Sequence, residues 1–232
     1  MQSILEWLFM DILNGTGPCK KRQKLNWKDN IIILANGQFP SAQQVLDLLS
    51  AAKIVICCDG AADKLVGFGM APHMIIGDMD SISDRTREQY ASSMIRSDDQ
   101  ETNDLTKAVE YCIGQGYASV TILGATGLRE DHTLGNVSLM LEYYPRIEVQ
   151  MVSDFGIFFL VRSGEEVVSQ PGDRISIFSI DNSVRVTSKG LKYPLNDLQL
   201  SKWYRASLNE VVEERFTLLF ESDIPLIVYR AW

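Results

Sequence analysis

The sequence predicts an α/β fold: a mainly parallel β-sheet with flanking helices, Rossmann-like, followed by an antiparallel β-sandwich domain. Up to about residue 153, short apolar runs that end in Gly, Asn or Asp alternate with amphipathic stretches, as in a parallel sheet covered by helices. Later residues form short runs broken by Gly, Pro, Asn and Asp, with no long helical pattern. We therefore expect domains at 29–153 and 154–232.

Five apolar runs are the expected strands of the first domain. The first, IIILANG, stops at Asn36-Gly37 in the manner of a buried strand that ends in a turn. The runs KIVICCDG, HMIIGDMDS and SVTILGATG have the same form, and IEVQMVSD ends the series.

Between these runs lie three expected helices. The first begins at Ser41, and the second spans 103–115 with Thr102 or Asn103 as its cap. The third spans 132–143. Helical spacing predicts the apolar face of each. The first helix has Val45, Leu48 and Leu49 on this face, the second has Leu105, Ala108, Val109, Cys112 and Ile113, and the third has Leu134, Val137, Leu141 and Tyr144.

In the second domain, apolar and polar residues alternate along Arg174–Ile177 and Val184–Thr187. This period of two is typical of strands with one buried face, which favours an antiparallel arrangement.

Composition restricts the classes of partner. The chain has 232 residues, a net charge of −8 and a pI near 4.8. An acidic surface repels phosphate backbones, so we expect no nucleic-acid partner. The four cysteines form no CxxC pair, and we interpret them as reduced thiols of a cytoplasmic protein: Cys19, Cys57, Cys58 and Cys112.

Residues 1–28 are expected to form a tail or a short helix. The apolar run Ile4–Leu13 is interrupted by Glu6 and Asp11 and is too short to span a bilayer. We therefore expect no membrane association.

Acidic residues follow several of the expected strands. Asp59 follows one strand, Asp78 and Asp80 follow the next, and Asp104 begins a helix. The carboxyl ends of neighbouring parallel strands share one edge, so these side chains are expected to converge there. A lone Asp after a strand is usually a turn former or a helix cap. Four of them at successive strand ends favour a magnesium site, because Mg²⁺ takes oxygen ligands and bridges to substrate phosphates.

The segment GATGLREDH follows the strand that ends at Leu123. Gly124 and Gly127, with Thr126 between them, let backbone N–H groups approach a phosphate, and Arg129 can bind its oxygens bidentately. The candidate nucleotide-binding residues therefore include these three and also Lys107, Asp131 and His132.

Two of these candidates have plainer alternatives. His132 is also explained as a helix-start residue, and Lys107 either reaches phosphate or only pairs with Asp104. The chain has neither a Walker A motif nor GxGxxG, so ordinary P-loop kinases and dinucleotide dehydrogenases do not fit.

Taken in order, these motifs resemble the thiamin pyrophosphokinase family. The matching segments are ILANGQFP, CDGAAD, PHMIIGDMDSI, DDQETNDLTKA and LGATGLREDHTLGN, and more weakly GLKYPL and SLNE. They cover the chain from about residue 31 to residue 212.

The resemblance implies transfer of a pyrophosphoryl group from ATP to the hydroxyl of thiamin, with Mg²⁺ as cofactor and AMP as a product. It assigns Asp59, Asp78, Asp80 and Asp104 to the metal and catalytic site, together with Arg129. Gln100 matches a position near thiamin. It also implies a homodimer with shared active sites, where Ser207 and Asn209 are expected to bind the acceptor.

The sequence departs from the family pattern at two glycines and one aromatic residue. Ala61 and Leu128 stand where glycines are usual, and Leu128 restricts a positive φ. Some relatives carry a Trp that stacks on thiamin. Val228 is nearest to its position, with Tyr229 and Trp232 as the aromatic alternatives.

Two other functions remain open from the sequence. One is a pyrophosphokinase that acts on another hydroxymethyl heterocycle, such as a pterin, with an unchanged acidic site. The other is a catalytically inactive nucleotide-sensing module, which a degraded acidic site would favour.

Overall fold

The computed structural model describes residues 30–99 and 101–232. The expected N-terminal segment 1–28, with Cys19, and the candidate Gln100 lie outside the described residues. The chain divides into two compact units, one ending at Phe159 and the other containing Leu160–Trp232. A mostly parallel sheet with helices and an antiparallel region are both present, which confirms the predicted fold class.

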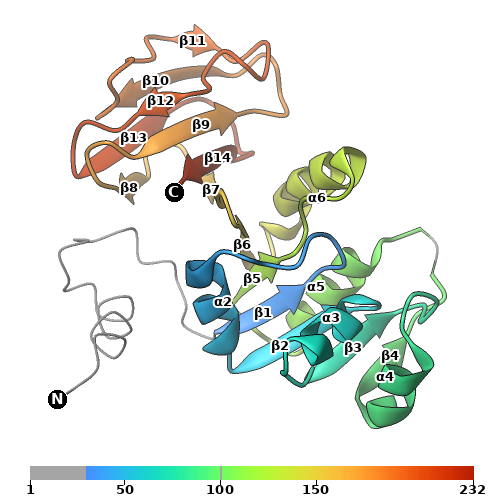
Figure 1. Ribbon diagram of the computed structural model, residues 1–232. Coiled ribbons are helices and arrows are strands. Elements are labelled where there is room, and N and C mark those ends of the chain that lie inside the picture. Colours follow the sequence, from blue (N-terminus) through green and yellow to red (C-terminus); the bar gives the residue numbers. More distant parts are fainter. Residues whose placement is uncertain (1–29, 100) are drawn as a thin grey trace, which may run out of the picture. The chain divides into compact units, whose positions relative to one another are not determined.

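The first unit is built on a sheet of order β7-β6-β5-β1-β2-β3-β4 (Figure 1). Strands β1 to β6 are parallel, and β7 runs antiparallel to β6. The central strands are almost wholly buried, because helices cover both faces. The strands are β1 Ile31–Leu34, β2 Ile54–Cys58, β3 Met74–Gly77, β4 Met94–Arg96, β5 Ser119–Leu123, β6 Glu148–Ser153 and β7 Gly156–Val161.

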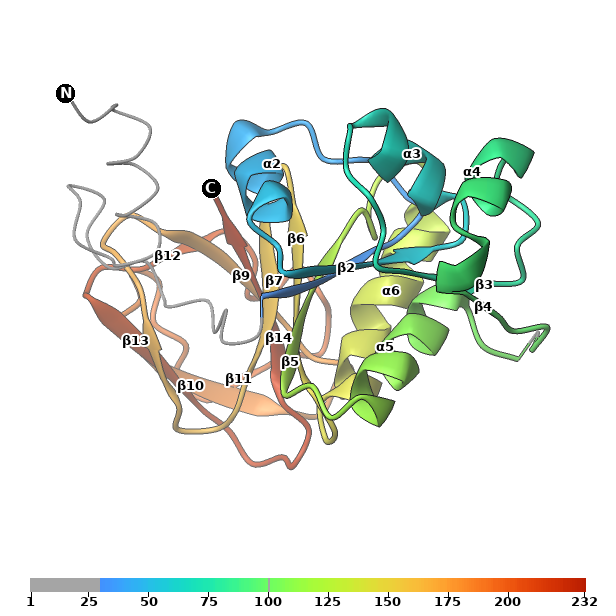
Figure 2. The same ribbon diagram turned by 90° about the horizontal axis from the view of Figure 1, so that it is seen from below.

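Helices cover this sheet on two sides: α2 and α3 lie over one face, and α5 and α6 over the other (Figure 2). The expected cap of α5 is confirmed, because Asn103 accepts a hydrogen bond from the Thr106 N–H at 2.8 Å. The helices are α2 Gln43–Ser50, α3 Ala61–Gly67, α4 Asp84–Gln89, α5 Asp104–Gly114 and α6 Glu130–Tyr143, with a 3-10 turn at Ala91–Ser93.

Two helix predictions need correction. Helix α2 begins at Gln43 rather than Ser41, because Ser41 donates its N–H and hydroxyl to the Asp154 carboxylate. In α6 the buried residues are Met140 and Tyr143, whereas Leu134, expected on the inner face, is 54% exposed. The Tyr143 hydroxyl lies 2.7 Å from the Thr106 hydroxyl of α5, and this contact turns that face of α6 toward α5.

One strand of the parallel part of the sheet was not predicted. Strand β4 has only three residues, is largely exposed and pairs on one side with β3. Its apolar signal is therefore too short to detect.

The second unit is antiparallel throughout. Its strands have the orders β12-β9-β14 and β11-β10-β13-β8. Residues 160–232 contain no helix. The strands are β8 Glu166–Val168, β9 Arg174–Phe178, β10 Arg185–Lys189, β11 Leu198–Gln199, β12 Asn209–Glu210, β13 Arg215–Leu219 and β14 Leu226–Ala231.

Within residues 30–99 and 101–232, no helix is long and apolar enough to cross a membrane.

Candidate active site

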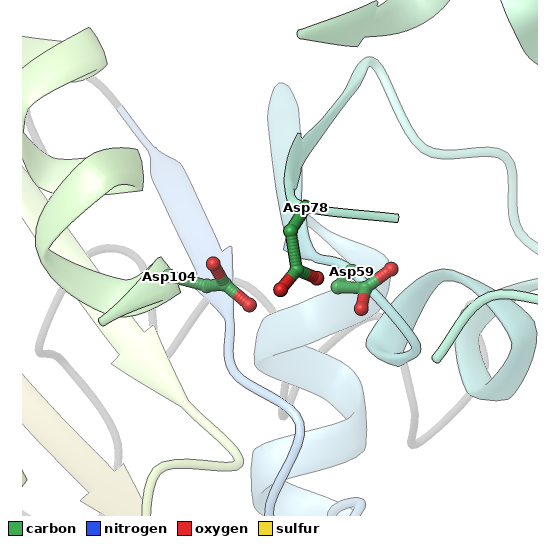
Figure 3. A group of neighbouring side chains, drawn as sticks. All are labelled: Asp59, Asp78 and Asp104. Atoms are coloured by element: carbon green, nitrogen blue, oxygen red, sulfur yellow. The ribbon is translucent and has the colours of Figure 1, made fainter. Parts of the chain in front are cut away.

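Three carboxylates meet at the carboxyl edge of the parallel sheet. Asp59 follows β2, Asp78 follows β3, and Asp104 is the first residue of α5. One oxygen from each lies within 4.8 Å of the others, and Figure 3 shows the three side chains next to one another. Adjacent parallel strands end at the same edge, so this convergence follows directly from the β2–β3 pairing.

Local backbone features allow the three residues to approach closely. A Cβ on Gly77 would lie 2.8 Å from the Cβ of Asp59 and 3.2 Å from the Asp104 carboxyl carbon. Only glycine fits at this strand end. Asp59 and Met79 also adopt left-handed backbone conformations, with φ of 40° and 68°. Such strain in residues other than glycine tends to concentrate at functional sites.

Asp59 is the most buried member of the cluster, at 2% exposure. Burial raises the pKa of this carboxyl, the N–H and hydroxyl of Ser81 lower it, and the neighbouring Asp80 and Asp104 carboxylates raise it. Its Oδ2 accepts the Ser81 N–H at 2.9 Å, but its Oδ1 has no hydrogen-bond partner among the described residues. A buried carboxylate oxygen without a partner, next to two further carboxylates, matches the donor set of a divalent cation.

Asp80 lies beside this group rather than within it. Its N–H donates to Asp78 Oδ1 at 3.3 Å, and its own Oδ1 accepts the Ser81 hydroxyl at 2.7 Å. We expected four converging carboxylates, and the structure groups three. The reason is that β3 ends at Gly77, so the alternation of strand side chains no longer applies beyond it, and Met79 turns the chain.

Lys107 points into the cluster. Its Nζ lies 3.1 Å from Asp104 Oδ1 and donates to the Ser97 carbonyl at 3.2 Å. Its side chain is only 9% exposed. The pairing with Asp104 is present, and a contact between Lys107 and phosphate stays a prediction.

The glycine loop after β5 lies against the loop after β1. Gly37 and Gln38 donate their N–H groups to the carbonyls of Gly124 and Thr126, at 2.7 and 3.0 Å. Gly124 has φ of 65°, and a Cβ there would lie 2.6 Å from the Ala35 carbonyl oxygen. This loop therefore requires glycine for both its conformation and its packing.

Arg129 and Asp131 form an exposed ion pair at the start of α6. Two guanidinium nitrogens contact the carboxylate, at 3.1 and 2.5 Å, and about two thirds of both side chains is exposed. His132 is exposed, and its N–H donates to the same carboxylate at 2.9 Å. Leu128 takes φ of 63° with 71% exposure, so it keeps the positive φ that the usual glycine would adopt.

Sequence reasoning missed the charged residues that secure these loops. Lys64 donates to the carbonyls of Asn36 and Gly37, at 3.0 and 2.8 Å. Asp63 accepts the Ser83 N–H at 2.8 Å, at the cap of α4. In the sequence these look like ordinary surface charges on short helices, so no pattern distinguishes them.

The acceptor candidates lie in the second unit. Asn209 is 3% exposed, and its amide exchanges hydrogen bonds with the backbone of Tyr193. The Ser207 hydroxyl donates to the Tyr204 carbonyl at 2.8 Å. Val228, nearest to the stacking position, is completely buried in β14.

Comparisons with known proteins cover both units. Residues 45–151 match the family model "Thiamin pyrophosphokinase, catalytic domain", and residues 156–229 match "Thiamin pyrophosphokinase, substrate-binding domain". Thiamine pyrophosphokinase 1 of Oryza sativa subsp. japonica is 26% identical over 226 residues, which is 84% of each chain. The Bacillus subtilis thiamine pyrophosphokinase is 25% identical over 179 residues, covering 73% of this chain and 84% of that protein.

Solved structures show the same fold. The thiamine pyrophosphokinase from Bacillus subtilis aligns with a TM-score of 0.70 at 23% identity, over 87% of this chain and 98% of that one. The thiamin pyrophosphokinase from Candida albicans aligns with a TM-score of 0.72 at 20% identity, over 89% and 90%. Because the two family models together match well over half of the sequence, this chain belongs to the thiamin pyrophosphokinase family.

Proposed function

We propose that the protein is a thiamin diphosphokinase: it transfers the pyrophosphoryl group of ATP to the hydroxyl of thiamin and releases AMP. Family membership across both units supports this activity. The observation that carries it is the cluster of Asp59, Asp78 and Asp104, in which one buried carboxylate oxygen has no hydrogen-bond partner among the described residues. Burying unpaired carboxylates destabilises the fold, so their presence favours an active metal-dependent site over an inactive sensing module.

We further propose that this cluster binds Mg²⁺, with Asp80 next to it. When bound, the ion would offset the negative charge of the ATP phosphates. The chain itself holds Asp104 in place through Lys107, and it holds Asp59 through the Ser81 N–H. The ligands are therefore positioned before substrate arrives, which lowers the cost of organising the site during transfer.

The nucleotide phosphates are proposed to bind at the glycine loop. The proposed donors are the backbone N–H groups of Gly124, Thr126 and Gly127. Arg129 is the N-cap of the helix that follows, and His132 lies in its first turn. The Arg129 guanidinium is exposed and paired with Asp131, so it can exchange one carboxylate for phosphate oxygens of the same geometry.

The thiamin is proposed to bind to the second unit, with Ser207 and Asn209 as candidate contacts. The description of the matching family model as a substrate-binding domain supports this division. We also propose a homodimer with shared active sites, as the resemblance implies. Mixing Asp78→Asn with Ser207→Ala protein tests the sharing, because subunit exchange should restore about a quarter of parental activity if both are nearly inactive alone.

AMP release from ATP tests the function. Purified protein with Mg²⁺ should release AMP with thiamin, and much more slowly with a hydroxymethyl pterin or with no acceptor. Faster release with the pterin would favour the other pyrophosphokinase. Binding of ATP without AMP release for any acceptor would favour a nucleotide sensor.

A further inference from the structure

Met79 lies between two acidic residues of the site in an unfavourable conformation. It has φ of 68°, a left-handed value that residues with a side chain rarely adopt. Its side chain is 8% exposed, so it packs inside the protein rather than relaxing into solvent. A conformation of this kind persists only where neighbouring contacts hold it.

Arg87 of α4 supplies such a contact. Its Nη2 donates a hydrogen bond to the Met79 carbonyl oxygen at 2.5 Å. The other guanidinium nitrogen lies 3.6 Å from Asp84, whose side chain is 92% exposed, so that ion pair is weak. The bond to the Met79 carbonyl is therefore the main contact of this guanidinium among the described residues.

Hydrogen bonds to α3 hold helix α4 in position, and with it Arg87. Ser83, its cap, donates its N–H and hydroxyl to Asp63 of α3, at 2.8 and 2.5 Å. The Thr86 hydroxyl donates to the same carboxylate at 2.5 Å. The segment between β3 and α4 is thereby held at its carboxyl end, and Arg87 reaches back to its middle.

We propose that Arg87 is a positioning residue for the acidic cluster. By holding the Met79 peptide, it keeps the chain turned so that Asp78 faces Asp59 and Asp104 and accepts the Asp80 N–H. Arg87 itself contacts none of the three carboxylates in the structure. The inference rests on the proposed function, since it assumes that the cluster binds a divalent cation.

Metal binding without turnover tests this role. Mn²⁺ binding to the full chain, without nucleotide, is measured by electron paramagnetic resonance for the parent, Arg87→Met, Arg87→Lys and Arg85→Met. Arg87→Met keeps the aliphatic stem and removes the donor. Arg85 is the matched control, an exposed arginine on the same helix for which the described residues show no partner.

We expect Arg87→Met to bind Mn²⁺ about tenfold more weakly, as for the loss of one charged hydrogen bond. The Mg²⁺ concentration for half-maximal AMP release should rise by a similar factor, with kcat at saturating Mg²⁺ within about threefold of the parent. Arg87→Lys retains a donor and should lose less affinity, and Arg85→Met should match the parent.

Parental Mn²⁺ affinity in Arg87→Met overturns the inference, even if its melting temperature in EDTA falls, because Arg87 would then only stabilise the fold. Asp78→Asn distinguishes a failure of the metal site from a failure of the positioning role of Arg87. If it binds Mn²⁺ far more weakly than the parent while Arg87→Met does not, the metal site stands and only the role of Arg87 fails. If the parent binds no Mn²⁺, both the metal site and this inference fail.

Discussion

Asp59 in the first unit and Asn209 in the second are both buried polar residues at or beside a left-handed backbone position, yet their side chains differ in their hydrogen bonds. Asp59 has φ of 40°, and Leu208, immediately before Asn209, has φ of 57°. The Asn209 Oδ1 accepts N–H groups from Tyr193 and Glu210, at 3.2 and 2.9 Å, and its Nδ2 donates to the Tyr193 carbonyl at 2.8 Å. By contrast, one Asp59 oxygen has no hydrogen-bond partner in the part of the chain that the structure describes.

The two residues differ in whether the chain itself satisfies their buried polar atoms. Burying a polar group is unfavourable unless it is hydrogen-bonded, so most buried groups find partners within the chain. Asn209 satisfies that rule and ties two segments of its unit together. Among the described residues, Asp59 Oδ1 departs from that rule beside two further carboxylates, as expected if its partner is the proposed cation.

The largest expected effect is the loss of activity in Asp78→Asn, which keeps the shape of the side chain and removes one charge from the cluster. We expect AMP release to fall at least roughly 100-fold, or about 2.7 kcal/mol of transition-state stabilisation. Asp47→Asn, a carboxylate on α2 outside the cluster, is the control and should remain fully active. Near-parental activity of Asp78→Asn at saturating Mg²⁺ would show that the carboxylate cluster does not take part in the reaction.

A smaller loss is expected for Arg129→Lys, which keeps the charge but not the forked geometry. Activity should fall about tenfold, mainly through weaker binding of ATP. The side chain is 65% exposed, so the melting temperature should hardly change. Full activity together with a lower melting temperature would instead make Arg129 a structural residue.

In the second unit, Asn209→Ala removes three hydrogen bonds from a buried position. We expect the free energy of unfolding to fall by about 2 kcal/mol, measured by urea denaturation. Ser207→Ala is the control, because it removes a single hydroxyl contact and should have a small effect. A large loss of thiamin affinity in Asn209→Ala, with unchanged stability, would show that this amide contacts the substrate directly.

The smallest effect concerns Leu128. Replacing it with glycine relieves the left-handed strain but adds freedom to the unfolded chain, and its exposed side chain loses little packing. We expect stabilisation of less than about 1 kcal/mol and little change in activity. A marked rise in ATP affinity for Leu128→Gly would show that the leucine restricts the nucleotide site.

Much of the fold follows from the sequence, because buried parallel strands are continuous apolar runs. The positions of Asp59, Asp78 and Asp104 at strand and helix ends were sufficient to predict that they converge. The pattern could not predict that Asp80 falls outside the group, since that depends on the left-handed turn at Met79.

Residues that act through a single contact were also beyond the sequence. Lys64 binds backbone carbonyls 27 and 28 residues earlier in the chain, Arg87 binds one eight residues earlier, and neither lies in a recognisable motif. The amphipathic spacing of α6 was misleading for a related reason. The hydrogen bond between Tyr143 and Thr106 fixes which face of that helix is buried.

We propose that the buried charge of Asp59 binds a cation, and the variant Asp59→Asn removes that charge while keeping the shape of the side chain. Burial raises the pKa of Asp59 in the metal-free protein, so the stabilisation associated with its neutral form is present in acid and is lost as the pH rises through that pKa. Removing the charge should therefore raise the stability of the metal-free protein at neutral pH, and it should abolish the reaction.

The measurement is the melting temperature at pH 7 of the parent and Asp59→Asn, each in EDTA and in Mg²⁺. We predict that the variant melts a few degrees higher than the parent in EDTA, about 1 kcal/mol for a chain of this size. Mg²⁺ should stabilise only the parent, and AMP release should be lost in the variant. If Asp59→Asn is instead less stable in EDTA and still responds to Mg²⁺ like the parent, Asp59 is a structural residue and not a ligand of the cation.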